Sequence, residues 1–135
     1  MLISNVISTR KREVFFQKNS LIRVPIRLGE DSFTSGHISD INLKRLIKAI
    51  SAFKLIMKVH NILFYKAFAT SALREASNKK YVLKKVLEKC KVKIEIIDGE
   101  KEAMIISKNN VSTIIPAHKI FLSIDVGGGS TEFSV

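Results

Sequence analysis

The stretch NILFYKAFATSALREAS, residues 61–77, decides the fold class that the sequence predicts. Its first ten residues are almost continuously apolar, which is typical of a short strand that is buried on both faces. Residues 71–77 then begin a helical pattern. A buried strand that passes directly into a helix is the repeating unit of α/β domains, so the stretch predicts the α/β class.

The same alternation continues on both sides of this stretch. A helix that starts at Ser39 or Asp40 runs to about residue 59, because apolar residues recur there at helical spacing. The predicted elements after residue 77 are a continued or restarted helix over 78–90, a strand over 92–98, a helix over 99–109 and a buried strand over 119–126. Strands separated by helices predict right-handed crossovers and a largely parallel sheet.

The first 40 residues differ from this alternation. Residues 1–7, 12–18 and 20–28 are interpreted as two or three β segments. Residues 29–40 contain Gly29, Gly36 and several small polar residues, a composition that predicts a loop.

Composition sets the limits on the class of protein. The 135 residues are one domain's length, and the hydrophobic fraction of 46% fits a packed globular chain. No apolar run approaches the roughly 20 residues that a membrane helix needs. The charges at 10–12 follow the first apolar residues, which argues against a signal peptide. The single cysteine, Cys90, has no partner for an internal disulfide, so we expect a reducing cytoplasm and a packed, apolar role.

The formal net charge of +11 predicts a polyanionic partner. Such a field attracts nucleic acid, an anionic membrane or a phosphate-rich substrate, whereas a lysine-rich solvated surface is the bland alternative. Aromatic residues are not interleaved with the lysines, so base stacking has weak support and we expect neither a nucleic-acid nor a membrane partner.

A glycine-rich segment near the end of the chain is the first candidate site. Asp125 ends a predicted buried strand, and Gly127, Gly128, Gly129 and Ser130 follow. Glycines at the carboxyl end of a strand let backbone N–H groups approach an anion, and the Asp125 carboxylate could hold Mg²⁺ or orient a water. A glycine-rich β-hairpin without a ligand is the alternative interpretation.

Two further segments carry candidate chemistry. Arg74 lies about one turn into the helix that follows residue 70, where it could reach an anion bound at the helix start; an arginine paired with a surface acid is the alternative. Glu100 and Glu102 lie at a strand-to-helix junction on different helix faces, so at most one faces the sheet edge. That one could act as a general base, although acids in a first helical turn are favoured by the helix dipole alone.

Three segments together resemble a known family. ATSALREASN (69–78), IIDGEKEA (96–103) and IDVGGGSTE (124–132), in this order and at this spacing, are similar to the exopolyphosphatase and guanosine-pentaphosphate phosphohydrolase family. That family belongs to the superfamily of actin, sugar kinases and heat-shock chaperone ATPases. The resemblance implies a ribonuclease-H-like, actin-like ATPase domain with a mixed sheet and flanking helices.

The resemblance also implies roles for single residues. Glu102 matches the catalytic glutamate and would activate water, and Arg74 matches a phosphate-binding arginine. Gly127, Gly128, Gly129 and Ser130 match a phosphate loop, and Asp125 and Glu132 would hold metal and water. The implied reaction is hydrolysis of terminal phosphoanhydride bonds of inorganic polyphosphate or guanosine pentaphosphate, with Mg²⁺, in the cytoplasm; a homodimer is compatible with it.

Departures from the family pattern set further expectations. The family's first phosphate loop and first strand are not found ahead of residues 1–7, and Met104 stands where an arginine is usual. We therefore expect a chain truncated at both ends, with residues 1–117 forming most of a first domain and residues 118–135 starting a second. Such a chain would be a poor enzyme alone, and its unpaired strand edges would favour self-association. A non-catalytic module that binds polyphosphate or nucleic acid, and an ATP binder of the same superfamily, are the alternatives.

Overall fold

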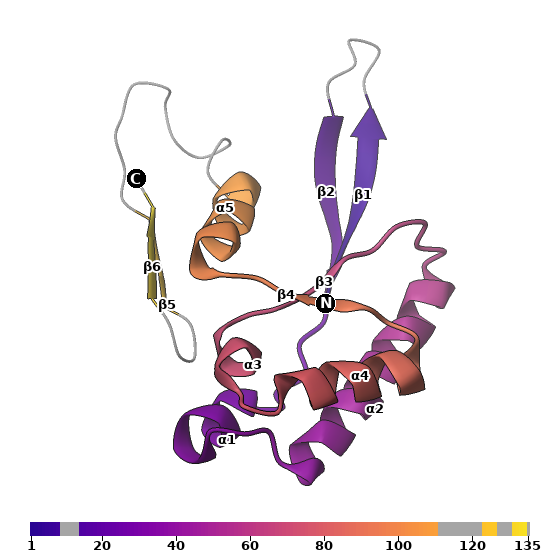
Figure 1. The fold of residues 1–135 in the computed structure, drawn as a ribbon. Coiled ribbons are helices and arrows are strands. Elements are labelled where there is room, and N and C mark those ends of the chain that lie inside the picture. The colour runs from indigo at the N-terminus through magenta and orange to yellow at the C-terminus, as the bar shows by residue number, and fades with distance from the viewer. Residues whose placement is uncertain (9–13, 111–122, 127–130, 135) are drawn as a thin grey trace.

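The structure, a computed structural model, describes residues 1–8, 14–110, 123–126 and 131–134 (Figure 1). Two short central strands, β3 (Ala67–Ala69) and β4 (Ile94–Ile96), pair in parallel. The connection between them contains α3 (Ser71–Glu75) and α4 (Lys79–Cys90), as parallel pairing requires a crossover. The predicted strand–helix–strand order is therefore confirmed, although β3 covers only the end of the predicted strand over 61–70.

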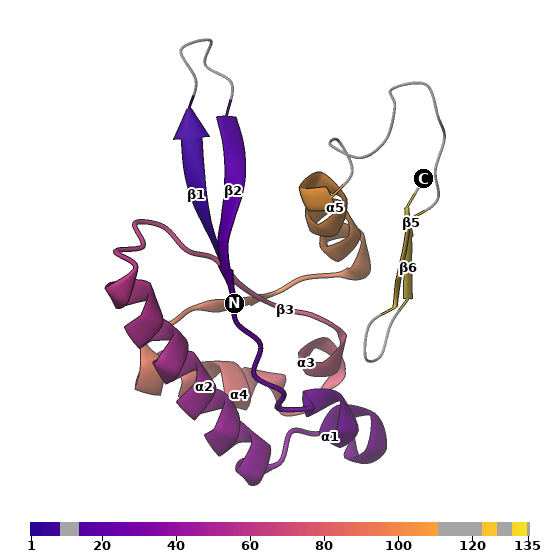
Figure 2. The ribbon, with the colours of Figure 1, turned by 180° about the vertical axis from the view of Figure 1, so that it is seen from behind.

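The core lies between two long helices. α2 (Asp40–Val59) begins as predicted, because the Ser39 side chain accepts a hydrogen bond from the Asn42 backbone N–H at 3.2 Å. Its apolar side packs against α4, and the two helices lie side by side in Figures 1 and 2. Val82 and Val86 of α4 are fully buried. Cys90 is buried at the end of α4, which agrees with the packed role predicted for it.

A helix replaces the predicted loop over residues 29–40. α1 (Leu28–Ser35) ends at Gly36, whose φ of 73° is left-handed and whose N–H donates to the Ser32 carbonyl. The prediction was wrong because this helix has little apolar periodicity of its own. Leu28 packs on the core, and Asp31 Oδ2 accepts a hydrogen bond from Ser39 N at 2.7 Å, so tertiary contacts hold the helix.

The chain begins with an antiparallel hairpin of β1 (Leu2–Ser8) and β2 (Val14–Leu21). The hairpin projects away from the helices in Figures 1 and 2. The third β segment, predicted over 20–28, is wrong beyond Leu21. Pro25 lacks an N–H, and the side chain of Arg45 donates to the carbonyl oxygens of Pro25 at 3.2 Å and Ile26 at 3.5 Å in place of a neighbouring strand.

The last elements are α5 (Gly99–Asn110), which confirms the predicted helix over 99–109, and an antiparallel hairpin of β5 (Ser123–Val126) and β6 (Thr131–Ser134). α5 contacts β6. The described residues thus contain three two-stranded sheets, one parallel and two antiparallel, with flanking helices, in agreement with the predicted α/β class. Within the same residues, no helix is both long and apolar enough to cross a membrane.

Candidate active site

The carboxyl ends of β3 and β4 lead into the two segments that carry the candidate residues. The register pairs Ala69 with Ile96, and Ile97 N donates to the Ala69 carbonyl at 3.0 Å, so both strands end at the same level. α3 starts directly after β3, and α5 starts three residues after the end of β4. Because ligands in α/β folds bind at the carboxyl ends of strands, this edge is where a site is expected.

Arg74 and Glu102 meet at this edge. Arg74 Nη1 lies 3.9 Å from Glu102 Oε2, and the same nitrogen donates a hydrogen bond to the Ile97 carbonyl at 2.7 Å. The Arg74 side chain is 25% exposed and that of Glu102 is 16% exposed. The structure therefore brings together two residues that lie 28 positions apart in the sequence, and shields both partly from water.

The start of α5 explains how Glu102 reaches this position. Asp98 Oδ1 accepts a hydrogen bond from Lys101 N at 2.8 Å, and the Asp98 carbonyl accepts one from Glu102 N at 3.0 Å. Asp98 thus caps the helix. Glu100 is exposed on the same first turn, whereas Glu102 is mostly buried. The prediction that at most one of these glutamates faces the sheet edge is confirmed.

Positive side chains surround the pair. Lys79 Nζ donates to the Arg74 carbonyl at 2.6 Å. Lys101 Nζ pairs with the Glu95 carboxylate and lies 5.7 Å from the centre of the Phe68 ring. The hydrogen bond and the charge of Lys101 lower the pKa of Glu95 below its usual range. The edge therefore carries three cations within one strand-to-helix turn of Glu102.

This arrangement has a definite chemical capacity. A distance of 3.9 Å is too long for a hydrogen bond, so the Arg74–Glu102 contact is an ion pair whose cation could also bind an anion. A guanidinium matches the geometry of phosphate oxygens, and a partly buried carboxylate can take a proton from a water molecule. Together they can hold a phosphate group and activate a nucleophile beside it.

A family comparison decides what kind of protein contains this arrangement. The family model for the Ppx/GppA phosphatase family matches residues 6–135 of the chain. The chain belongs to this family. The resemblance that the sequence predicted from its three segments is thereby confirmed.

Curated proteins related to this Ppx/GppA chain include two kinds of enzyme. A bifunctional 3-dehydroquinate synthase/phosphatase of Fusobacterium nucleatum is 36% identical over 113 residues, which are 82% of this chain and 17% of that protein. Exopolyphosphatase 1 of Mycobacterium bovis is 30% identical over 122 residues, which are 85% of this chain and 33% of that protein. The chain thus spans about a third or less of the length of these relatives.

Solved structures confirm the fold of this Ppx/GppA chain. An exopolyphosphatase from Cytophaga hutchinsonii matches with a TM-score of 0.84 and 26% identity, over 98% of this chain and 41% of that one. The Aquifex aeolicus Ppx/GppA family member matches with a TM-score of 0.71 and 22% identity over the same shares. The second likeness shows the fold alone.

The remaining predicted site residues lie on or between β5 and β6. The backbone register places Asp125 opposite Glu132, and directly opposed residues are the closest cross-strand neighbours. Gly127, Gly128, Gly129 and Ser130, which connect the two strands, lie outside the described residues. Two carboxylate residues at paired positions fit a Mg²⁺ ion, which prefers oxygen ligands. Elsewhere in the described part of the chain, no cluster of three or more metal-binding side chains occurs.

Sequence analysis assigned no role to Asn78. Its side-chain Oδ1 accepts from Ile38 N at 2.9 Å, and its Nδ2 donates to the Ile38 carbonyl at 2.8 Å. This pair of bonds ties the start of α4 to the connection between α1 and α2. Ser77 adds a third tie, because its N–H donates to the Gly36 carbonyl at 2.8 Å. The end of the segment ATSALREASN therefore supports the frame behind Arg74, and no sequence signal names its partner 40 residues away.

Proposed function

We propose that this chain carries part of the site of a phosphohydrolase that releases terminal phosphate from inorganic polyphosphate, with Glu102 as the general base. The observation that supports this most is the meeting of Arg74 and Glu102 at the carboxyl ends of β3 and β4. Membership of the Ppx/GppA phosphatase family and the exopolyphosphatase relatives give the reaction class.

The proposed reaction assigns one step to each group. Arg74 binds oxygens of the terminal phosphate and offsets the negative charge that develops on them. Glu102 takes a proton from a water molecule, whose oxygen forms a bond to the terminal phosphorus. The phosphoanhydride bond breaks, and the shortened polyphosphate leaves with the electron pair of that bond. Arg74 must therefore move from the Ile97 carbonyl toward the phosphate, or serve both at once.

The second half of the site is proposed to come from the hairpin of β5 and β6. Asp125 and Glu132 would hold Mg²⁺, and backbone N–H groups of Gly127, Gly128, Gly129 and Ser130 would bind phosphate oxygens. The ion, when bound, would neutralise phosphate charge. Guanosine pentaphosphate is the second substrate of this proposal, because it carries the same terminal bond, and the reducing cytoplasm is the proposed location.

A substrate comparison tests the proposal. The chain is incubated with Mg²⁺ and long-chain polyphosphate, guanosine pentaphosphate or ATP, and released phosphate is measured with and without EDTA. We expect release from polyphosphate that EDTA abolishes. Preferential hydrolysis of ATP would contradict the proposal in favour of a kinase- or chaperone-type site. Tight binding of polyphosphate without any release would replace it with the non-catalytic module.

A further inference from the structure

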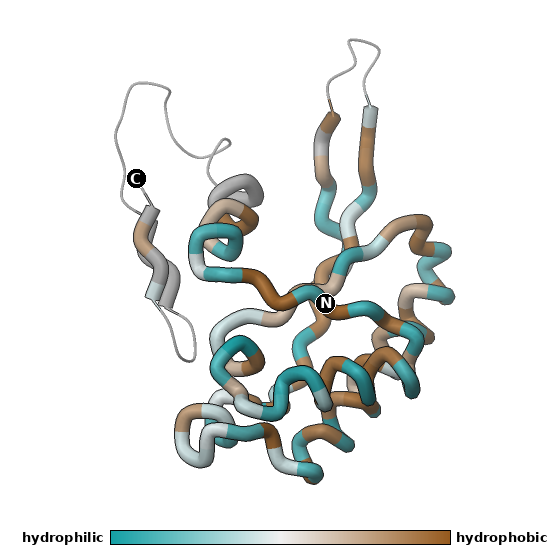
Figure 3. Tube along the Cα trace, in the orientation of Figure 1, coloured by the Kyte–Doolittle hydropathy of each residue, from teal (hydrophilic) through white to brown (hydrophobic). Residues whose placement is uncertain are grey.

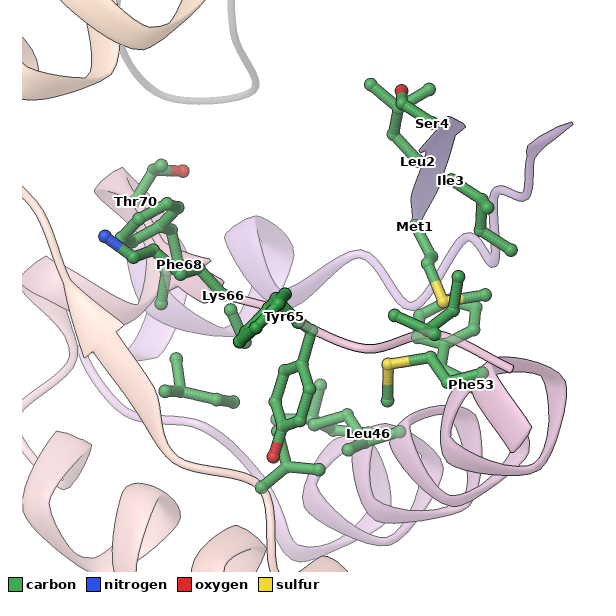
Figure 4. A pocket seen from close by; sticks show the side chains of 18 of the residues that line it. Met1, Leu2, Ile3, Ser4, Leu46, Phe53, Tyr65, Lys66, Phe68 and Thr70 are labelled. Carbon is green, nitrogen blue, oxygen red and sulfur yellow. The ribbon is translucent and has the colours of Figure 1, made fainter. Parts of the chain in front are cut away.

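The largest cavity of the structure is an apolar groove away from the candidate active site. Its volume is about 780 Å³, and it lies between β1, α2 and the segment that leads into β3 (Figure 4). Leu46 and Phe53 of α2 form one wall, and Met1 to Ser4 form the wall across from it. Lys66 is the only charged side chain among the lining residues.

The rim of this groove is exposed and apolar. Six large residues both line the groove and are exposed by 36% to 90%, namely Leu2, Val6, Phe16, Phe64, Tyr65 and Phe68. Phe64 is 90% exposed, and its neighbour Leu63 is 85% exposed. We call the groove and these residues the groove face. In Figure 3 the same strands of the hairpin are coloured largely as hydrophobic.

The size of the groove face points to a protein-sized contact. Aromatic side chains bury roughly 150–250 Å² each, so the exposed part of this face amounts to on the order of 800 Å². That is about the area that one partner contributes to a stable interface, roughly 800 Å². It exceeds the roughly 300–600 Å² of the largest apolar patch on a typical monomer.

The strands beside the groove have free edges. β1 pairs with β2 and β3 pairs with β4, and in the described residues no backbone hydrogen bond joins β1 to β3. An open strand edge next to an apolar face is a template for pairing with another chain. In a two-fold arrangement, the β1 edge of one copy can pair antiparallel with the β1 edge of the other.

From these observations we propose that the groove face is the interface between two copies of this chain. The charge distribution supports a second copy here, because two molecules with a net charge of +11 repel each other least where the contact holds a single lysine. The two copies bury Phe64 and its neighbours against each other and join their β1 edges into one sheet. This interface is independent of the proposed phosphohydrolase reaction.

Sedimentation equilibrium of the full chain over a range of concentrations tests the interface. We expect a dimer at about 100 µM protein, and a dissociation constant that falls as NaCl is raised, because salt screens the repulsion between the copies. A monomer at this concentration would overturn the proposal, as would assemblies larger than a dimer. Association that disappears with added salt would also overturn it, since a polyanion would then bridge the copies.

A pair of matched variants locates the contact. Phe64→Glu places a charge on the groove face, and we expect it to raise the dissociation constant roughly tenfold or more. Ile41→Glu makes the same kind of change at a residue that is 72% exposed on α2 and does not line the groove, and we expect dimerisation as in the parent chain. Equal effects of the two variants would refute this location. Circular dichroism verifies that both variants fold.

Hydrogen exchange gives an independent reading of the same interface. As protein concentration rises, amide exchange should slow in residues 1–6 and 64–69, while α4 exchanges at an unchanged rate. Protection that appears elsewhere, with none in these two segments, would contradict the groove face as the contact.

Discussion

Arg74 has two roles in the structure that a sequence motif cannot separate. Its guanidinium lies beside Glu102, as a phosphate-binding arginine near a catalytic base should, and it also donates to the Ile97 carbonyl. The first partner was predicted from the resemblance of two segments to one family. The second partner is a backbone oxygen 23 residues away, and a backbone oxygen leaves no trace in the choice of side chains.

Replacing Arg74 tests its structural role. Arg74→Ala removes the donor to the Ile97 carbonyl and the cation beside Glu102, so we expect a loss of about 1–3 kcal/mol in the free energy of unfolding. Arg74→Lys keeps the charge without the planar fork and should recover part of the loss. Lys84→Ala is the control, because Lys84 forms only a surface pair with Glu88. Urea unfolding that ranks Arg74→Ala with Lys84→Ala would contradict this role.

Asn78 offers a sharper case, because its amide matches both polar groups of Ile38. Asn78→Asp keeps the shape but turns a donor into an acceptor that faces the Ile38 carbonyl. We expect it to lower the free energy of unfolding by more than Asn78→Ala does, with a loss of about 1–3 kcal/mol even for Ala. Urea unfolding at neutral pH measures both variants. An aspartate variant as stable as the parent would show that the two bonds contribute little.

Among the elements, those that were predicted correctly contain their own signal. α2 has apolar residues at helical spacing and a serine cap, and α5 follows an Asp-Gly start with acids in its first turn. α1 was missed because its order depends on Leu28 in the core and Asp31 at the next helix. β3 is shorter than its apolar run, because β4 offers only three residues to pair with.

The link between α1 and α2 should make stability depend on pH. Hydrogen bonds from the Ser39 side chain and backbone lower the pKa of Asp31 below its model value of 3.8. A depressed folded-state pKa adds stability above the unfolded-state pKa, and this stability is lost as pH falls through the folded-state pKa.

The prediction follows from that sign. Asp31→Asn should be less stable than the parent chain at about pH 6, and the difference should shrink as pH falls from about 5 to about 2. Urea midpoints measured across this range test it. Glu30→Gln, a change on the same exposed turn, is the control and should show no such convergence. A constant difference for Asp31→Asn would contradict the assignment.

At the scale of the whole molecule, the sequence predicted the family and the edge where the site lies, but not the groove face. Motif residues are local, and their meeting follows from the parallel pairing of β3 and β4. The groove depends instead on where the hairpin of β1 and β2 lies relative to α2, which no run of residues encodes. The positions proposed for Mg²⁺ and the phosphate loop remain predictions.

The net charge of +11 has a separate consequence at this scale. It is spread over a chain whose candidate site already contains Arg74, Lys79 and Lys101. A long polyanion can contact the site and the surrounding surface together, whereas a short substrate contacts only the site. This favours polyphosphate as the substrate of the proposed reaction.

The rate of phosphate release by Glu102→Gln tests the central claim most directly. Initial rates from long-chain polyphosphate with Mg²⁺ are compared for the parent chain, Glu102→Gln and Glu100→Gln, whose exposed side chain lies on the same first turn. Loss of a general base costs about 10²–10⁴-fold, so we predict release by the parent and Glu100→Gln and a loss of that size in Glu102→Gln. Equal rates for all three proteins would contradict the account.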